Sequence, residues 1–312
     1  MKRNQISPIL SAKPTLILIV GPTAVGKTEL CLNLAKKFNT DIVSCDSRQF
    51  YREMEIGTAK PTPQELAEVP HHLINSISIE DPYDVKQFEE DALKILDKLF
   101  REKDVVIMTG GSGLFAKVIS EGIDEMPEVD PQFRKQLIQE FEEKGITHLQ
   151  EELKKADPDY YALVDTQNPQ RLMRALEIIR GTGKPFSSFR QQKKVERPFR
   201  VLKIGLNRER DELYRRIDAR MDLMIDEGLF EEAEKLFEKR HLNALQTVGY
   251  QEIFGYLEGN YDREEAIRLL KRNSRRYAKR QLTWFKKDAE IQWFKPGELN
   301  QIINWIDHQL AS

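Results

Sequence analysis

Short apolar runs, separated by longer amphipathic stretches, mark the first half of the chain. Three of them, Leu16 to Val20, Ile42 to Cys45 and Val105 to Met108, are each followed by residues suited to a tight turn. Runs of this length, bounded by turn residues, are typical of strands buried on both faces of a parallel sheet. We predict further strands at His71 to Ile79 and at Arg200 to Leu206.

The pattern changes between Asp124 and Arg197, where the sequence is charged and no strand is predicted. Apolar residues recur there at helical spacing: Phe133, Leu137, Ile138, Phe141 and Leu149. Amphipathic helices are the expected structure. Strand character returns at Val201 to Leu206, and from Asp211 onward we predict helices alone.

A glycine-rich loop directly follows the first apolar run and precedes an amphipathic stretch. Its residues are Gly21, Pro22, Thr23, Ala24, Val25, Gly26, Lys27 and Thr28, a complete G-x-x-x-x-G-K-[ST] pattern. In such a loop, backbone N–H groups and a helix N-terminus bind phosphate, the lysine reaches terminal oxygens and the threonine hydroxyl ligates Mg²⁺. The pattern predicts that Thr28 is a Mg²⁺ ligand. A polyphosphate ligand is indicated, but ATP and a diphosphate ester fit equally well, and a glycine turn with an incidental lysine is the alternative.

The turns after the three apolar runs are Gly21 to Lys27, Asp46 to Gln49 and Thr109 to Gly113. Because ligands of open α/β sheets bind at the carboxyl ends of the strands, these turns should converge on one crevice. We therefore predict an α/β fold, a P-loop NTPase-like parallel sheet flanked by helices. Its catalytic core is residues 1–123 and 198–312 with the C-terminal helices, and residues 124–197 form a helical insertion domain.

The composition is that of an ordinary globular protein, with 312 residues, 40% hydrophobic and 32% charged. No run approaches the roughly 18 apolar residues of a membrane span, so no membrane association is expected. The basic segment Met1 to Leu10 lacks a signal-peptide core, which favours a cytoplasmic location. Cys31 and Cys45 are expected to be buried and inert, and His71 with His72 has no carboxylate at metal-ligand spacing. We expect a monomer with no obligate protein partner.

A basic segment lies near the C-terminus, although the formal net charge of the chain is −2. Nine basic residues occur between Arg268 and Lys287, with no acidic residue among them. The first seven fall on one face of a helix: Arg268, Lys271, Arg272, Arg275, Arg276, Lys279 and Arg280. Such a face repels itself unless a polyanion neutralises it, which favours phosphate contact over a solvated or internally paired surface.

Six separated motifs carry a family resemblance: the phosphate loop, Asp46 to Pro61, Gly110 to Phe115, Gln167 to Glu177, Gln246 to Glu252 and Lys279 to Phe285. Together, and in this order, they resemble the tRNA dimethylallyltransferases from about residue 15 to about residue 287. Val25 stands where serine is common in the family, and Phe115 stands where tyrosine is usual. Neither departure puts the activity in doubt, because backbone amides do most of the phosphate binding.

The resemblance implies transfer of a dimethylallyl group from dimethylallyl diphosphate to the N6 amine of the adenosine 3′ of a tRNA anticodon. The products are N6-dimethylallyladenosine and diphosphate, so the loop would hold a diphosphate and not ATP. Mg²⁺ is the implied cofactor, and the helical insertion would grip the anticodon arm. The chain lacks the cysteine and histidine set of the eukaryotic zinc finger, which implies the bacterial form.

The leaving diphosphate needs positive charge around it. Lys27, the loop amides, Thr23 and Mg²⁺ would supply it, since negative charge develops there as the carbon–oxygen bond breaks. By resemblance Arg216 and Arg220, one helical turn apart, join them. The alternative for these arginines is a pair of salt bridges with Asp218 or Asp222.

The adenine amine needs a proton acceptor, and Asp46 at the end of the second strand is our choice of general base. An N-cap, or a Mg²⁺ ligand through water, is the alternative reading of that residue. Ser112 is a hydrogen-bond partner near the reacting amine.

By resemblance, four segments and Ser112 contact tRNA. The predicted residues are Asp46, Ser47, Arg48, Gln49, Ser112, Gln170, Arg171, Leu172, Met173, Arg174, Gln246, Thr247, Val248, Gly249, Tyr250, Gln251, Lys279, Arg280, Gln281, Leu282, Thr283, Trp284, Phe285 and Lys286. Amides read base edges, arginines hold phosphate, and Phe50, Tyr51 or Tyr250 can stack on a base extruded from the loop. Each aromatic residue is individually more often part of a core.

Two other functions compete. A small-molecule kinase of adenylate-kinase-like type would share the loop and the sheet, but it leaves the basic segment and Gln167 to Glu177 unexplained. A non-catalytic RNA-binding protein with a regulatory nucleotide site is the third reading, which Asp46 beside the loop argues against.

Overall fold

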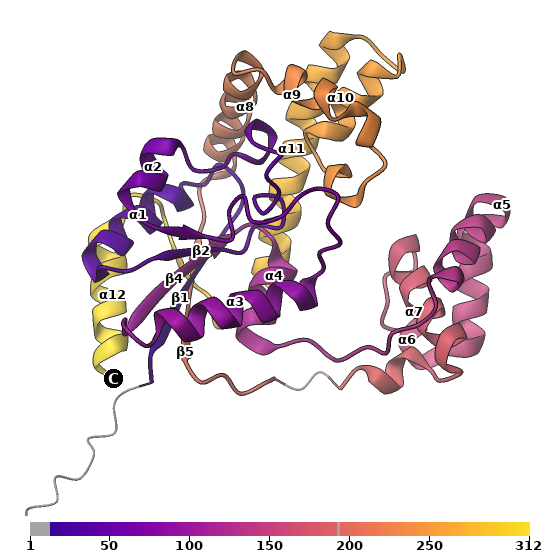
Figure 1. The fold of residues 1–312 in the computed structure, drawn as a ribbon, viewed down its shortest axis with the longest axis horizontal. Helices are drawn as coiled ribbons and strands as arrows, with labels where there is room; N and C mark the ends of the chain where they lie inside the picture. The colour runs from indigo at the N-terminus through magenta and orange to yellow at the C-terminus, as the bar shows by residue number, and fades with distance from the viewer. Residues whose placement is uncertain (1–12, 192–193) are drawn as a thin grey trace, which may run out of the picture. The chain divides into compact units, whose positions relative to one another are not determined.

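Six parallel strands form one sheet, in the order β3-β2-β4-β1-β5-β6, in the computed structural model, which describes residues 13–191 and 194–312. The strands are β1 (Thr15–Val20), β2 (Ile42–Ser44), β3 (His71–His72), β4 (Val105–Gly110), β5 (Arg200–Leu206) and β6 (Gln292–Phe294). β1 lies between β4 and β5, with Thr15 opposite both Val105 and Arg200. The predicted parallel α/β sheet is confirmed (Figure 1).

Two of the predicted elements differ from the structure. The strand expected at His71 to Ile79 ends at His72, because Leu73 (φ 59°) and Asn75 (φ 54°) adopt left-handed backbone conformations that interrupt a strand. The prediction of helices alone after Asp211 was wrong at β6. This edge strand has three residues, too few for a period in the sequence, and pairing with β5 defines it.

Both faces of the sheet are covered by helices, as the alternation along β1 shows. Ile17 and Ile19 belong to one apolar cluster with buried residues of α1 (Lys27–Phe38), α8 (Arg210–Asp226) and α12 (Leu299–Ala311). Leu16 and Leu18 belong to a second cluster with α3 (Val85–Leu99) and α4 (Gly113–Glu121). Since side chains of a strand alternate between faces, burial of every β1 residue places it in the middle layer of a sandwich.

A third apolar cluster lies beside the sheet. It joins Met54 and Tyr51 to buried residues of α9 (Leu229–Lys235), α10 (Tyr250–Leu257) and α11 (Arg263–Phe285). Short 3₁₀ turns η1 (Ile56–Thr58), η3 (Phe237–Lys239) and η4 (Asn243–Leu245) connect these elements, and α2 (Pro63–Glu68) precedes β3. Helix α11 contributes to all three apolar clusters. Ala278 belongs to the first, Phe285 to the second and Leu270 to the third.

The chain divides into two compact units. One consists of the residues up to Ser120 together with Glu196–Ser312 and holds the sheet; the other is Glu121–Val195. The second unit contains α5 (Pro131–Ala156), α6 (Pro158–Tyr161), α7 (Pro169–Thr182) and η2 (Phe186–Phe189) around its own apolar cluster. α5 is interrupted at Gly145, whose φ of 74° is not helical. No helix among the described residues is both long and apolar enough to cross a lipid bilayer.

Candidate functional site

The phosphate loop turns from β1 into α1 at the centre of the sheet. Gly21 is required by a close approach, because a Cβ there would lie 2.7 Å from the carbonyl oxygen of Leu206 on β5. Gly26 caps α1 with φ 109°, a conformation that other residues rarely adopt. Ala24 is also left-handed, at φ 61°. The loop backbone is thus folded tightly around one spot at the carboxyl end of β1, as phosphate binding requires.

Lys27 points into this loop. Its Nζ donates hydrogen bonds to the carbonyl oxygens of Gly21 and Pro22, both at 2.9 Å. Burial lowers the pKa of the ammonium group to about 8; the charge of Asp46 opposes this shift and Arg220 adds to it. The lysine is therefore a poorly solvated cation whose charge becomes more favourable when an anion arrives.

Three arginines surround the outside of the loop. Arg216 of α8 donates its Nε proton to the carbonyl of Ala24 at 2.9 Å, and Arg220, one turn later, donates to Thr23 Oγ1 at 3.5 Å. Desolvation, then the charge of Arg216, lowers the pKa of Arg220. Arg208, directly after β5, donates to the carbonyl of Val25 at 2.9 Å. Sequence reasoning missed Arg208, although its position after a strand next to the loop was a usable signal.

The alternative partners of the α8 arginines are occupied elsewhere. Asp218 pairs with Arg275 of α11, and Asp222 pairs with Lys271. Arg216 and Arg220 are thus oriented toward the phosphate loop, and the structure does not support salt bridges between them and these two aspartates.

Asp46 follows β2 and faces the loop after β4. Its N–H donates to Ser44 Oγ at 3.2 Å, and its Oδ1 accepts from the N–H of Arg48 at 3.1 Å, so one oxygen stabilises the turn. A Cβ placed on Gly111 would lie 3.6 Å from Oδ2, so this oxygen faces the loop after β4. The arrangement leaves one carboxylate oxygen for chemistry while the other holds the residue in place.

The loops after β1, β2 and β4 are brought together by hydrogen bonds. Ser47 donates its N–H to Ser112 Oγ at 3.0 Å, which joins the second loop to the third. Gln281 of α11 accepts from the N–H of Thr23 and donates to the carbonyl of Gly111, each at 2.9 Å, which joins the first to the third. Helix α11 therefore holds the first and third loops together.

Tyr277 also faces this site, and sequence reasoning missed it. Burial raises the pKa of its phenol to about 12, with the charge of Asp46 raising it further and a hydrogen bond with Ser112 lowering it. The signal that could have found it is its place one turn before Gln281, on the α11 face away from the basic residues.

The predicted tRNA contacts divide by exposure. Six of them are buried inside the protein: Leu172, Met173, Gly249, Tyr250, Gln281 and Phe285. Lys279, Arg280 and Thr283 of α11 are exposed, as is Lys286 directly after it, and Trp284 is 38% exposed, packed over Gly113. The buried residues were included because continuous helical segments were predicted to contact tRNA. In a packed helix only the outward-facing positions are accessible.

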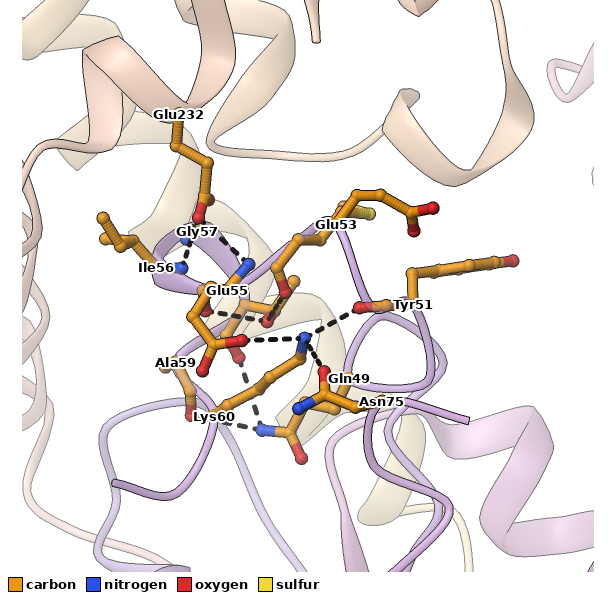
Figure 2. A network of polar contacts seen from close by, with 12 residues as sticks. Gln49, Tyr51, Glu53, Glu55, Ile56, Gly57, Ala59, Lys60, Asn75 and Glu232 are labelled. Carbon is orange, nitrogen blue, oxygen red and sulfur yellow. Dashed lines mark hydrogen bonds and ion pairs between the residues drawn. The ribbon is translucent and has the colours of Figure 1, made fainter. Parts of the chain in front are cut away.

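Tyr250 and Gln49 have roles inside the protein, and Figure 2 shows the surroundings of Gln49. The hydroxyl of Tyr250, fully buried, donates to Glu232 at 2.6 Å, so stacking on a base is not open to it. Phe50 and Tyr51 are buried too, at 1% and 5% exposure, and are core residues. The Gln49 amide donates to the carbonyls of Thr58 and Ala59 and does not face outward.

The basic face of α11 is partly paired within the protein. Arg268 binds Glu265 in the preceding turn, and the Lys271 and Arg275 pairs with α8 neutralise two more charges. Within residues 13–191 and 194–312, Arg276 and Lys279 are exposed and form no ion pair. The cationic surface is therefore narrower than the sequence pattern indicated.

Gln170 to Arg174 belong to the second unit, on α7. Arg180 of the same helix binds Glu140 and Glu152 together, and His148 contacts Glu140 at 3.1 Å. Among the described residues these two carboxylates and His148 are the one cluster of three His, Cys, Asp or Glu side chains close enough together to ligate a metal ion, but the guanidinium already binds the carboxylates. The network stabilises the packing of α7 on α5.

Comparison with known proteins identifies relatives over nearly the whole chain. The family model for IPP transferases matches residues 49–288. A tRNA dimethylallyltransferase of Cytophaga hutchinsonii is 54% identical over 95% of this chain and 97% of its own. The tRNA dimethylallyltransferase 1 of Bacteroides thetaiotaomicron is 51% identical over 94% of this chain and 95% of its own.

Two solved structures are similar in fold. The full-length tRNA isopentenylpyrophosphate transferase of Bacillus halodurans has a TM-score of 0.72 and 39% identity, covering 96% of this chain and 97% of that one. A eukaryotic dimethylallyltransferase, captured in crystallographic snapshots of its action on tRNA, has a TM-score of 0.72 and 26% identity. That match covers 90% of this chain and 74% of the eukaryotic one.

Proposed function

We propose, since the chain belongs to the tRNA dimethylallyltransferase family, that it transfers a dimethylallyl group from dimethylallyl diphosphate to the N6 amine of the adenosine 3′ of a tRNA anticodon. The observation that carries the proposal is the meeting of a phosphate loop with a carboxylate. Lys27 lies close enough to Asp46 for the aspartate charge to oppose the lowering of the Lys27 pKa by burial, and the loops on which the two residues lie are joined by Gln281 and Ser112.

In the proposed reaction the carbon–oxygen bond of the allylic diphosphate breaks, and its electron pair leaves with the diphosphate. Lys27 stabilises the negative charge that develops, exchanging its bonds to the loop carbonyls for bonds to phosphate oxygens. Arg216 and Arg220 add positive charge from α8 and hold the loop backbone. Thr23, which Arg220 contacts, would add its hydroxyl to the groups that bind the diphosphate.

The new carbon–nitrogen bond forms between the allylic carbon and the adenine N6. A proton must leave that nitrogen, and Asp46 Oδ2 is the acceptor that we propose, since Oδ1 is engaged by the backbone of Arg48. Ser112, held by Ser47, lies beside Asp46 and can orient the amine. The basis of this assignment is the position of Asp46 at the carboxyl end of β2, opposite the phosphate loop.

Mg²⁺ fits the donor set of the site. The Thr28 hydroxyl offers a hard oxygen ligand in the first turn of α1, and Mg²⁺ prefers oxygen and retains several waters. When bound, the ion would neutralise charge on the leaving diphosphate. Thr28, in the first turn of α1, is the residue that we propose as its protein ligand.

The substrate tRNA would meet the exposed residues of α11 and the second unit. Arg276 and Lys279 are exposed cations of α11 without an ion pair among the described residues, and we propose that they contact the phosphate backbone. Arg276→Ala should weaken tRNA binding and lower the slope of log affinity against log salt concentration by about 1. Glu264→Gln, at the exposed start of the same helix, is the control. An unchanged slope would remove Arg276 from the interface.

The proposed function is tested by following the transfer of label from two different donor substrates. Purified protein, Mg²⁺ and unmodified tRNA are incubated with radiolabelled dimethylallyl diphosphate, and in a parallel reaction with γ-labelled ATP. Label should enter the tRNA only from the prenyl diphosphate. Phosphoryl transfer from ATP without prenylation would overturn the proposal and leave a kinase.

The role of Asp46 is tested by Asp46→Ala. Single-turnover prenyl transfer should fall by at least about 100-fold, the scale of a lost general base, while tRNA affinity changes far less. Asp97→Ala, in an exposed ion pair on α3, is the matched control and should retain full activity. Equal loss of transfer and of tRNA affinity would make Asp46 a binding residue.

A further inference from the structure

The carboxylate of Glu232, on α9, accepts hydrogen bonds from four donors. Figure 2 shows it beside Ile56 and Gly57. Its Oε2 accepts from the N–H groups of Glu55 at 3.0 Å and Ile56 at 2.8 Å. Its Oε1 accepts from the N–H of Gly57 at 2.9 Å and from the hydroxyl of Tyr250 at 2.6 Å. Three consecutive backbone N–H groups are thus bound by one ion, an arrangement whose charge-assisted bonds are about twice as strong as neutral ones.

The segment that Glu232 binds is the start of η1, in the long connection between β2 and β3. A second charge fixes the same segment from the other side. Lys60, with a side chain 1% exposed, donates to the carbonyl of Tyr51 at 2.7 Å and to the carboxylate of Glu55 at 3.3 Å (Figure 2). Desolvation of Lys60 lowers its pKa, so the connection is held by a charged group that is itself removed from water.

Hydrogen bonds continue from this segment to Asp46. The side-chain amide of Gln49 donates to the carbonyls of Thr58 at 3.3 Å and Ala59 at 3.2 Å. The oxygen of the same amide accepts from Ser44 Oγ at 3.2 Å, and Ser44 Oγ accepts in turn from the N–H of Asp46 at 3.2 Å. The N–H of Gln49 also donates to the carbonyl of Asp46 at 3.1 Å. Asp46 is therefore linked to η1 through Gln49 by two routes. The backbone N–H of Gln49 bonds to Asp46 directly, and the side-chain amide of Gln49 reaches Asp46 through Ser44.

From this connected geometry we infer that Glu232 is a positioning residue for the carboxylate of Asp46. It acts through η1 and Gln49, touches no reacting atom, and fixes the turn on which the proton acceptor stands. The inference rests on the proposed function, in which Asp46 takes the proton of the adenine amine. A base on a loop needs such support, because displacement by about 1 Å can lower a rate about 100-fold.

The perturbation is Glu232→Gln. The amide keeps the shape of the carboxylate, but one of its two ends carries N–H groups and cannot accept a hydrogen bond. Either Oε1 with its two donors or Oε2 with its two donors is therefore lost as an acceptor. Single-turnover prenyl transfer should fall by about 10-fold to 100-fold, with tRNA affinity and the KM for dimethylallyl diphosphate unchanged. Glu234→Gln, on the exposed side of the same helix, should match the wild type.

A double-mutant cycle with Asp46→Ala separates positioning from general damage. If Glu232 acts through Asp46, Glu232→Gln should not lower the residual rate of Asp46→Ala any further, since no carboxylate remains to be positioned. Tyr250→Phe removes one of the four donors and keeps the buried ring, so the protein stays folded. Its rate should fall in the same direction as that of Glu232→Gln and by less.

The outcomes separate the positioning role of Glu232 from the proposed function. Full activity of Glu232→Gln, additive losses in the double mutant, or a parallel fall in tRNA affinity would each overturn the positioning role while the proposed function stands. Absence of prenyl transfer by the wild-type protein would overturn the proposed function itself, and the positioning role with it.

Discussion

Gln281 offers the sharpest test of how the site is held together. Its buried side chain connects the N–H of Thr23 in the phosphate loop to the carbonyl of Gly111 in the loop after β4. Gln281→Met keeps the length and approximate volume of the side chain and removes both hydrogen bonds. Any effect of the substitution therefore reports the polar connection more than the packing.

The magnitude follows from the surroundings of the two partners. The bond to the Gly111 carbonyl lies in a buried environment, and a buried acceptor left without its donor costs about 1–3 kcal/mol. The Thr23 N–H is only part-buried, so water can replace its partner and the loss is about 0.5–1.5 kcal/mol. The free energy of unfolding should fall by about 2–4 kcal/mol, within the 5–15 kcal/mol of a typical domain, so the protein remains folded.

Urea unfolding followed by tryptophan fluorescence measures this loss. All three tryptophans, Trp284, Trp293 and Trp305, lie in the unit that contains the sheet, so their emission reports that unit. Gln64→Met, at an exposed position of α2 in the same unit, is the control and should stay within about 0.5 kcal/mol of the wild type. A Gln281→Met protein as stable as this control, with an unchanged KM for dimethylallyl diphosphate, would refute the bridge as a stabilising element.

Three further predictions follow from other contacts. Lys27 has its pKa lowered to about 8, so kcat/KM for dimethylallyl diphosphate should fall as pH rises through about 8, and Lys27→Arg should abolish this dependence; persistence of the same profile in the variant would assign it to another group. Glu140 has its pKa lowered from 4.5 to about 2, chiefly by hydrogen bonds from Arg180, so its contribution to stability is present above pH 4.5 and lost toward pH 2. The difference in thermal unfolding between wild type and Glu140→Gln should therefore shrink over that range, and a constant difference would contradict this. Gly57→Ala would place a Cβ 2.6 Å from the ring of Tyr250 and should destabilise by about 1–3 kcal/mol in urea unfolding, whereas a neutral result would show that the ring moves aside.

Local patterns made much of this fold predictable from sequence. The phosphate loop was recognisable because strand, glycine turn, lysine and helix are adjacent in the chain, and the structure places them at β1 and α1. The meeting of the Asp46 and Gly111 loops with it follows from a topological rule, that parallel strands present their carboxyl ends together. Such inferences need no knowledge of side-chain partners.

Other features depend on contacts between distant residues and left no local signal. In the sequence, Glu232 is one of several acidic residues on α9. The backbone N–H groups that it binds lie about 175 positions earlier in the chain. Gln281 was predicted to contact tRNA because it lies in a family motif, yet its amide is used inside the protein. Asp218 and Asp222 were considered as partners of α8 arginines, but α11 supplies their actual partners. Side-chain pairing across helices is decided by packing, which one sequence does not display.

The contribution of α11 to three apolar clusters has a consequence for synthesis on the ribosome. The central strand β1 is made early, but the clusters on its two faces and beside the sheet lack Ala278, Phe285 and Leu270 until α11 has been translated. The sheet unit must therefore wait for long-range contacts late in translation, whereas the core of Glu121–Val195 is contiguous in the chain and complete much earlier. Nascent chains that stop before α11 would expose the unfinished clusters, and they are the species that we expect chaperones and proteases to encounter.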